Sequence, residues 1–183
     1  EDILPSISTV SSAVHAALFL LTPSFIIERT CLSKARGSVD RLATIMFTSG
    51  STGMPKGVML THANILANLE AITQVVRFAP SDRMLGALPL FHSFGFTATL
   101  WLPLRLGLGV VYHFNPLDAR TIGNLVAEHE LTAILGTPTF LLAWMRRVDP
   151  EKFKTLRLVI VGAEKLREEV AKAFAEKYKV TPL

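Results

Sequence analysis

The sequence predicts an α/β domain in which helices flank a largely parallel β-sheet. Short apolar runs of the kind found in strands alternate with segments of helical periodicity from about residue 42 to the end of the chain. Chains that alternate strand and helix in this order form parallel sheets with helices packed on them. Half of the 183 residues are hydrophobic, which is enough for one domain with a sizeable core and too many for a disordered chain.

Residues 1–40 lack this regular pattern, and we expect a helical or irregular lead-in segment before a domain formed by residues 41–183. The most apolar stretch, residues 13–27, contains a histidine and a proline and is shorter than the roughly 20 residues of a membrane-spanning helix. It also lacks the basic leading region of a signal peptide. The sequence therefore predicts no membrane span, although peripheral contact with a membrane surface stays open.

The first half of the domain is predicted to form a strand, a loop, a second strand and then alternating helices and strands. Thr61 is a suitable N-cap, because apolar residues recur after it at three- and four-residue spacings. The segment 97–106 is apolar on most sides, as buried helices are, and Gly107 is suited to end it. The predicted strands are 43–48, 58–60, 84–88 and 109–113, and the predicted helices are 62–76 and 97–106.

The second half continues the alternation, with Asp118 as a candidate cap for its first helix. The predicted strands are 132–135 and 156–161, and the predicted helices are 118–130, 140–148 and 166–178. The sequence ends at Leu183 soon after a helix, where an α/β domain would supply another strand. We therefore expect a truncated domain.

Charge and cysteine content restrict the function classes. The formal net charge is +4, and the basic residues after residue 150 are interleaved with glutamates and form no stripe that would follow a nucleic-acid backbone. We therefore expect no nucleic-acid partner. The one cysteine, Cys31, excludes an internal disulfide and a zinc site built on several cysteines, and it fits a reducing, cytoplasmic location.

A loop between the first two predicted strands has the composition of a phosphate-binding site. It is composed of Thr48, Ser49, Gly50, Ser51, Thr52, Gly53, Met54, Pro55, Lys56 and Gly57. Glycines let backbone N–H groups approach an oxyanion, hydroxyl groups donate hydrogen bonds, and Lys56 supplies a compact positive charge. A flexible surface turn rich in Gly and Ser is the competing interpretation.

The phosphate loop of nucleoside triphosphatases does not fit this segment. That loop needs Gly-Lys followed by Ser or Thr, and it leads into a helix. Here Lys56 follows Pro55, precedes Gly57 and leads into a predicted strand. A triphosphatase or kinase of that class remains only a weak third hypothesis.

The loop, together with Val58 and the following Thr61-His62-Ala63-Asn64, resembles the motif of the adenylate-forming superfamily. This superfamily includes acyl-CoA synthetases, luciferases and the adenylation domains of peptide synthetases. The resemblance covers about residues 40–183 and implies part of the large N-terminal AMP-binding domain of such a ligase. It also implies that the loop, through Thr48 to Gly53 and Lys56, holds the β- and γ-phosphates of ATP.

Two further segments match motifs of the same superfamily. Pro89-Leu-Phe-His-Ser-Phe-Gly95 resembles the motif in which an aromatic residue or a histidine gates the acyl pocket, and His92 is that position. Gly162, Ala163 and Glu164 follow a predicted strand and resemble the adenine-side segment, although Glu164 and Lys165 replace the commoner Ala-Pro pair. Residues 136–139 and Phe94 to Phe96 would line the acyl pocket.

Each of these assignments has a structural alternative. A lone histidine among apolar residues is more often structural than catalytic, residues 162–164 could be a simple strand-to-helix turn, and the aromatic residues could belong to the core. Because a carboxylate is already ionised at neutral pH, His92 is expected to position and gate its substrate and not to act as a general base. The other histidines show no metal-ligand spacing.

The resemblance implies a ligase that forms an acyl-adenylate from ATP and a carboxylic acid and then transfers the acyl group to a thiol. The closest resemblance is to the acyl-carrier-protein synthetase part of bifunctional 2-acylglycerophosphoethanolamine acyltransferases. That part implies a long-chain fatty acid, with acyl-carrier protein or coenzyme A as acceptor. The main Mg²⁺ ligand and the C-terminal catalytic lysine are absent, so we expect the 183 residues alone to be inactive. A non-catalytic nucleotide- or acyl-binding module is the alternative.

Overall fold

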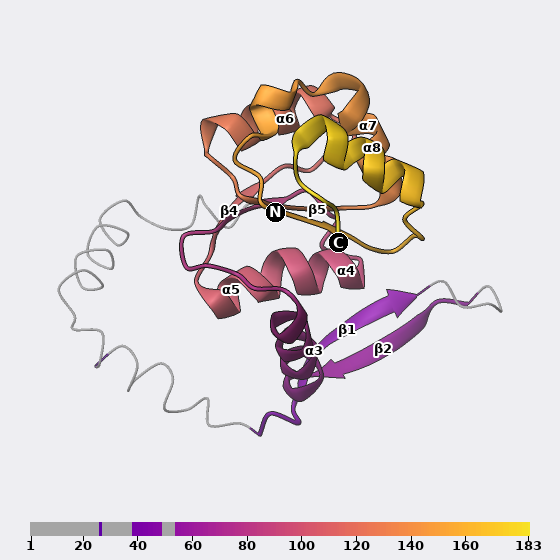
Figure 1. The fold of residues 1–183 in the computed structure, drawn as a ribbon. Helices are drawn as coiled ribbons and strands as arrows, with labels where there is room; N and C mark the ends of the chain where they lie inside the picture. Colours follow the sequence, from indigo (N-terminus) through magenta and orange to yellow (C-terminus); the bar gives the residue numbers. More distant parts are fainter. Residues whose placement is uncertain (1–25, 27–37, 49–53) are drawn as a thin grey trace, which may run out of the picture. The chain divides into compact units, whose positions relative to one another are not determined.

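The computed structural model describes Ile26, residues 38–48 and residues 54–183. Residues 42–183 form one compact unit with two sheets (Figure 1). Its strands are β1 (Leu42–Thr48), β2 (Lys56–Thr61), β3 (Arg83–Gly86), β4 (Gly109–Tyr112), β5 (Ala133–Gly136) and β6 (Leu158–Val161). Its α-helices are α3 (His62–Val75), α4 (Ser93–Gly95), α5 (Leu102–Leu106), α6 (Ala119–Glu128), α7 (Pro138–Arg147) and α8 (Glu168–Tyr178).

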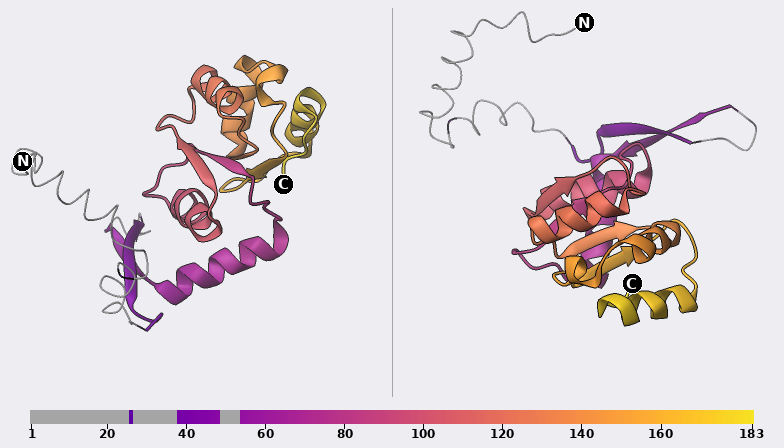
Figure 2. Two further views of the ribbon diagram at one scale, coloured as in Figure 1. Left: turned by 90° about the vertical axis from the view of Figure 1, so that its left-hand side faces the viewer. Right: turned by 90° about the horizontal axis from the view of Figure 1, so that it is seen from above.

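The main sheet has four strands in the order β4-β3-β5-β6, and every neighbouring pair is parallel. Successive strand residues face opposite sides of the sheet, which gives each side its own core. Leu85, Ile134 and Val159 pack against α6, α7 and α8, whereas Met84 and Leu135 pack against α3 and the helix that contains α5. Helices therefore cover both faces (Figure 2), as the alternation of strands and helices predicted.

β1 and β2 form a separate antiparallel pair, so the two predicted strands are confirmed. Thr61 caps α3 as expected, because its hydroxyl accepts a hydrogen bond from the backbone N–H of Asn64. The Asn64 side chain accepts one in return from the Thr61 N–H. Ile65 and Leu69 of α3 are buried, but Leu66 is exposed.

The segment predicted as one buried helix begins earlier than expected and changes its winding. α4 begins at Ser93, a π-helical stretch follows at Phe96–Trp101, and α5 completes the segment. The hydroxyl of Thr99 donates to the carbonyl oxygen of Gly95 at 2.7 Å within the π-helical stretch. Gly107 ends α5 with φ of 69°, the left-handed conformation that favours glycine at this position.

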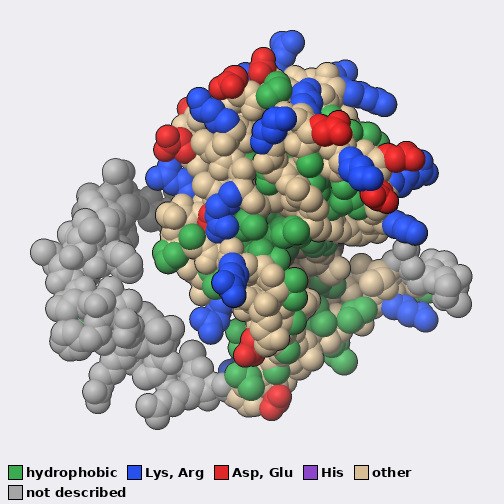
Figure 3. Space-filling view, viewed as in Figure 1, with side chains coloured by type: hydrophobic (Ala, Val, Ile, Leu, Met, Phe, Trp, Pro, Cys, Tyr) green, Lys and Arg blue, Asp and Glu red, His purple; other side chains and the backbone are tan. Residues whose placement is uncertain are grey.

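The helices α6 and α7, on the other face of the main sheet, each begin after a residue that caps them. Asp118 caps α6 as predicted, through a hydrogen bond from the backbone N–H of Thr121. α7 begins two residues before the predicted start, because Thr137 caps it and Pro138 is suited to the first helical position. Charged side chains of both signs are mixed over the layer that contains α6 and α8 (Figure 3), in line with their interleaving in the sequence. No helix among the described residues has the length and apolar content to cross a bilayer.

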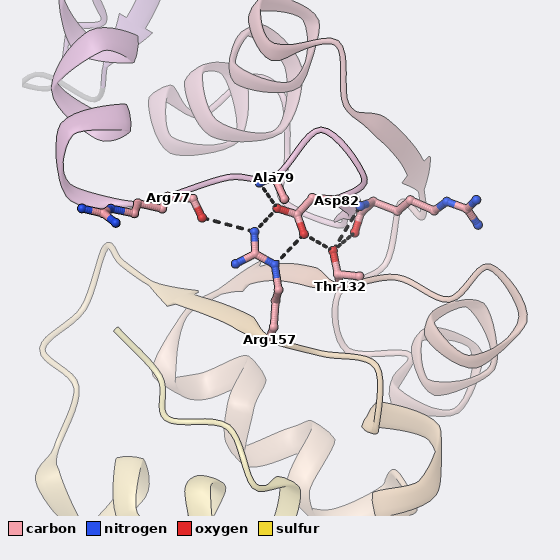
Figure 4. Close-up of polar contacts among 6 residues, drawn as sticks. Arg77, Ala79, Asp82, Thr132 and Arg157 are labelled. Atoms are coloured by element: carbon pink, nitrogen blue, oxygen red, sulfur yellow. Dashed lines mark hydrogen bonds and ion pairs between the residues drawn. The ribbon is translucent and has the colours of Figure 1, made fainter.

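A hydrogen-bonded network joins three chain segments at the amino-terminal edge of the sheet (Figure 4). Asp82 is only 2% exposed and accepts hydrogen bonds from the backbone N–H of Ala79 and from the hydroxyl of Thr132, both at 2.7 Å. The guanidinium of Arg157 donates to both carboxylate oxygens of Asp82 and to the carbonyl oxygen of Arg77. The network therefore ties together the starts of β3, β5 and β6.

Leu183 also joins the sheet. Its backbone N–H donates to the carbonyl oxygen of Val159 at 2.8 Å, and its carbonyl oxygen accepts from the N–H of Val161 at 2.9 Å. This is the hydrogen-bond pattern of a parallel neighbour of β6. The backbone at Leu183 thus lies beside β6.

Candidate functional site

The carboxyl ends of β3, β5 and β6 lie at one edge of the parallel sheet, the edge at which open α/β sheets bind ligands. A pocket of about 340 Å³ lies there, within the volume range of small-molecule sites. It is lined by Leu88, Pro89, His92, Ser93, Phe94, Gly95, Thr137, Phe140 and Ala163. Residues from three distant parts of the sequence therefore meet in one place.

His92 reaches this pocket because the chain turns sharply between β3 and α4. The His92 N–H donates to the carbonyl oxygen of Pro89 at 3.2 Å, and the His92 carbonyl accepts from the N–H of Phe96 at 2.9 Å. The backbone is thus held on both sides while the side chain stays exposed. The His92 ring lies 4.5 Å from the ring of Phe91, centroid to centroid. Such an arrangement suits a side chain that contacts a ligand.

Gly95 explains why this turn is so tight. A Cβ atom at Gly95 would lie 2.2 Å from the carbonyl oxygen of Pro89, a backbone atom that cannot move aside cheaply. Only glycine allows α4 to begin this close to the end of β3. The glycine of the Pro89–Gly95 motif therefore places His92 and Phe94 at the edge of the sheet.

The turn after β6 contributes Ala163 to the lining of the same pocket. Gly162 donates its N–H to the carbonyl oxygen of Gly136 at 3.1 Å, which links the ends of β6 and β5. Ala163 has a positive φ of 65°, a conformation that non-glycine residues rarely adopt and that is common at functional sites. The carboxylate of Glu164 accepts a hydrogen bond from the hydroxyl of Thr139 at 3.1 Å.

The small size of Gly162 makes room for a neighbouring ring. A Cβ atom on Gly162 would lie 2.9 Å from the ring of Phe94, so that ring fills the space beside the glycine. Ala163, by contrast, lines the pocket and is exposed. The predicted residues Gly162 and Ala163 thus differ in what they contact.

The structure describes only the two ends of the predicted phosphate-binding loop. Thr48 and Lys56 face each other across the hairpin, and the Thr48 hydroxyl lies 3.5 Å from the Lys56 carbonyl oxygen. Lys56 begins a strand, which separates this loop from the triphosphatase loop that opens a helix. The predicted residues Ser49, Gly50, Ser51, Thr52 and Gly53 lie outside the described residues.

The structure thus brings four of the predicted elements into the pocket: His92, the Phe94-Gly95 pair, Thr137 of the predicted segment 136–139, and Ala163. Thr48 and Lys56 do not line it, and Phe96 instead lines a surface pocket beside β1. Leu88 and Phe140 were not predicted, and their position at strand ends and helix starts was the only sequence signal for them. Among residues 38–48 and 54–183, no cluster of three His, Cys, Asp or Glu side chains could hold a metal ion.

The comparison with protein families gives a match over nearly the whole chain. A model of the family described as AMP-binding enzyme matches residues 12–183, so the match extends into the lead-in segment. Among curated proteins, a putative acyl-CoA synthetase (YngI) of Bacillus subtilis is 32% identical over 142 residues, or 75% of this chain and 25% of its own length. Gramicidin S synthase 2 of Brevibacillus brevis is 32% identical over 158 residues, or 85% of this chain and 4% of its own.

Solved structures agree with this match. ATP-bound MatB from Rhodopseudomonas palustris has a TM-score of 0.70 at 29% identity and covers 80% of this chain and 29% of its own. O-succinylbenzoate coenzyme A synthetase (MenE) from Bacillus subtilis, in complex with ATP and a magnesium ion, has a TM-score of 0.68 at 30% identity, and 76% of this chain is covered. The chain spans about a quarter of the length of the acyl-CoA ligases that it matches.

Proposed function

We propose that this chain, which belongs to the family of AMP-binding enzymes, forms part of a ligase that activates a carboxylic acid with ATP. The acid would become an acyl-adenylate, and its acyl group would then pass to a thiol. The observation that carries this proposal is the pocket at the carboxyl edge of the sheet. There, His92 and Phe94 of one motif meet Ala163 of another, although the two motifs lie far apart in the sequence.

His92 is the proposed contact to the reacting carboxylate. The ring of His92 is exposed, and the His92 backbone is held by hydrogen bonds on both sides. This arrangement favours a role in positioning the substrate over a role in proton transfer. A carboxylate needs no base at neutral pH, so a fixed donor or steric gate is sufficient. Catalysis would then depend on orientation and on neutralising phosphate charge.

ATP would bind between this pocket and the loop of the hairpin. Ala163 and Glu164, with Gly162 behind them, form the proposed adenine side, and the loop residues Thr48 to Gly53 with Lys56 form the proposed phosphate side. ATP supplies the phosphorus that the acid attacks and the pyrophosphate that leaves. Mg²⁺ would accompany the phosphates, with its main ligand outside this chain.

We propose a long-chain fatty acid as substrate and acyl-carrier protein or coenzyme A as the thiol acceptor. Support comes from the apolar residues of the pocket and from a long-chain-fatty-acid–CoA ligase of Bacillus subtilis, which is 31% identical over 139 residues. We also propose that the intact protein is fused to an acyltransferase and is cytoplasmic, with peripheral contact to a membrane. We further propose that the chain divides into a lead-in segment at residues 1–40 and a partial AMP-binding domain at residues 41–183.

The test is ATP–pyrophosphate exchange by the intact protein across a series of carboxylic acids. Lys56→Ala should lower the exchange rate by roughly 10- to 1000-fold, because it removes the charge that faces the phosphates. Lys154→Ala is a matched control, since Lys154 is an exposed lysine paired with Glu151 at 3.6 Å. An exchange rate that is unchanged in the Lys56 variant would contradict the assignment.

The alternative is a non-catalytic module that binds a nucleotide or an acyl group. It predicts ATP or fatty-acid binding by the intact protein without exchange for any acid. We also expect no adenylation by the 183 residues alone, because they span about a quarter of the matched ligases.

A further inference from the structure

A second pocket, lined by basic side chains, lies on the face of the main sheet that α6, α7 and α8 cover. Its volume is about 210 Å³, and it is bounded by the first turns of α6, the end of α7 and the 3₁₀ helix at Pro150–Phe153. We call it the basic pocket. It shares no residue with the pocket at the carboxyl edge of the sheet, so a ligand bound here would leave that site free.

Three cations line the basic pocket together with a single carboxylate, that of Asp149. Within the described part of the chain, Arg120, Arg147 and Lys152 form no ion pair. The Asp149 carboxylate accepts a hydrogen bond from the backbone N–H of Glu151 at 3.1 Å. The pocket therefore keeps a surplus of positive charge that the protein does not neutralise.

A glycine within α6 makes room for one of these cations. A Cβ atom at Gly123 would lie 3.3 Å from Cδ of Lys152 and 2.9 Å from Cγ1 of Val148. The hydrocarbon stem of Lys152 thus passes close to the helix at Gly123, and its ammonium group donates to Oδ1 of Asn124, a neutral partner. A glycine inside a helix costs about 1 kcal/mol relative to alanine, so helix formation alone does not favour it here. The half-buried lysine is positioned at the pocket with its charge uncompensated.

From these contacts we propose that the basic pocket binds a phosphate group. A phosphate monoester carries nearly two negative charges at neutral pH and has three acceptor oxygens, so it can accept from several donors at once. The guanidinium groups of Arg120 and Arg147 present paired N–H donors that match phosphate oxygens, and Lys152 adds a compact charge.

The size of the basic pocket limits what can enter it. Sites that enclose a whole small molecule have volumes of about 300 to 1000 Å³, and this pocket is smaller. It fits a ligand of which the phosphate is the part that enters. The phosphate would belong to a free anion or to a lipid headgroup that ends in a phosphate monoester.

Isothermal titration calorimetry with inorganic phosphate and with pyrophosphate tests the free anion. The intact protein would carry Lys56→Ala, which weakens the phosphate side proposed for ATP. Adding Lys152→Met keeps an apolar stem in place but removes the charge, and it should raise Kd by about tenfold. Arg147→Ala should have an effect of similar size. Lys172→Met is the matched control and should leave Kd unchanged, because Lys172 lies on α8 and pairs with Glu168 at 2.7 Å.

Cosedimentation with vesicles tests the lipid headgroup. Vesicles of phosphatidylcholine with added phosphatidic acid are compared with vesicles of phosphatidylcholine alone. Binding that needs both phosphatidic acid and Lys152 would identify a lipid phosphate, whereas calorimetric binding that needs Lys152 would identify a free anion. If neither kind of binding depends on Lys152 and Arg147, the proposal is wrong.

Two further measurements define the chemistry of the basic pocket and separate it from the proposed ligase activity. Acetate at the same ionic strength should bind at least tenfold more weakly than phosphate, since it carries one charge and two acceptor oxygens. Equal binding of acetate and phosphate would contradict a phosphate site. ATP–pyrophosphate exchange by Lys152→Met alone should equal that of the wild type, so the two proposals can fail independently.

Discussion

The two edges of the parallel sheet differ in whether their polar side chains are paired within the protein. At the amino-terminal edge, Asp82, Thr132 and Arg157 satisfy one another through hydrogen bonds, and Asp82 is almost completely buried. At the carboxyl edge, His92 and Ala163 are exposed around a pocket, and Ala163 adopts a backbone conformation that is unusual for its type. A polar group that is fully paired within the protein contributes to stability, whereas an unpaired one is free to bind a ligand. We therefore expect stability and activity to separate between these edges.

The largest effect that would test this separation is expected at the carboxyl edge. His92→Ala should lower kcat/KM for exchange by about 100-fold, since misplacement of the reacting carboxylate by about 1 Å has effects of this size. The melting temperature should stay unchanged because the side chain is exposed. His129→Ala, an exposed histidine beyond the end of α6, should change neither quantity. A fall in the melting temperature of the His92 variant would assign this residue to the fold instead.

A smaller effect of the opposite kind is expected at the amino-terminal edge. Asp82→Ala should lower the free energy of unfolding, measured with urea, by about 2 kcal/mol. Loss of a buried partner of an ion pair often has a larger effect, but the Arg157 side chain is 43% exposed and can be hydrated. Exchange activity below the melting temperature should be retained. In the exposed pair of Arg83 and Glu130, by contrast, Glu130→Ala should change stability by less than about 0.5 kcal/mol.

The smallest effect concerns pH. Burial raises the pKa of the Asp82 carboxyl, but the hydrogen bonds from Arg157, Thr132 and Ala79 outweigh it and lower the pKa below the ordinary value of 3.8. A carboxylate whose pKa is lowered in the folded state stabilises the protein above its unfolded pKa, and this stability is lost as the pH falls through the folded pKa. The difference in unfolding free energy between wild type and Asp82→Asn should therefore shrink below about pH 4. A difference that is constant from about pH 6 to about pH 3 would show that the charge of Asp82 contributes nothing.

The same two edges show which features of the structure the sequence alone could predict. The carboxyl edge was largely predictable, because its residues follow strands directly and belong to short motifs. The caps at Thr61 and Asp118 and the helix end at Gly107 were also predictable, since each depends on neighbouring residues. These features are local in the chain.

The network at Asp82 could not be predicted, because its three side chains come from segments that only the folded sheet brings together. The packing of the Phe94 ring beside Gly162 could not be predicted for the same reason, because the two residues lie far apart in the sequence. The π-helical stretch after Gly95 was also missed, because periodicity predicts a helix without distinguishing how it is wound. Contacts across the fold, and not sequence patterns, determine these features.

The strand order β4-β3-β5-β6 also has a consequence for how the chain assembles. β3 can pair with β4 as soon as the helical segment between them has formed, but its other edge must wait for β5, which follows α6. Parallel pairing across such long connections is intrinsically slow, since the loop must close before the contacts form. During synthesis, the unpaired edge of β3 would therefore stay open until β5 has left the ribosome. The pocket at the carboxyl edge of the sheet would be completed last, when β6 and the turn that contains Ala163 arrive.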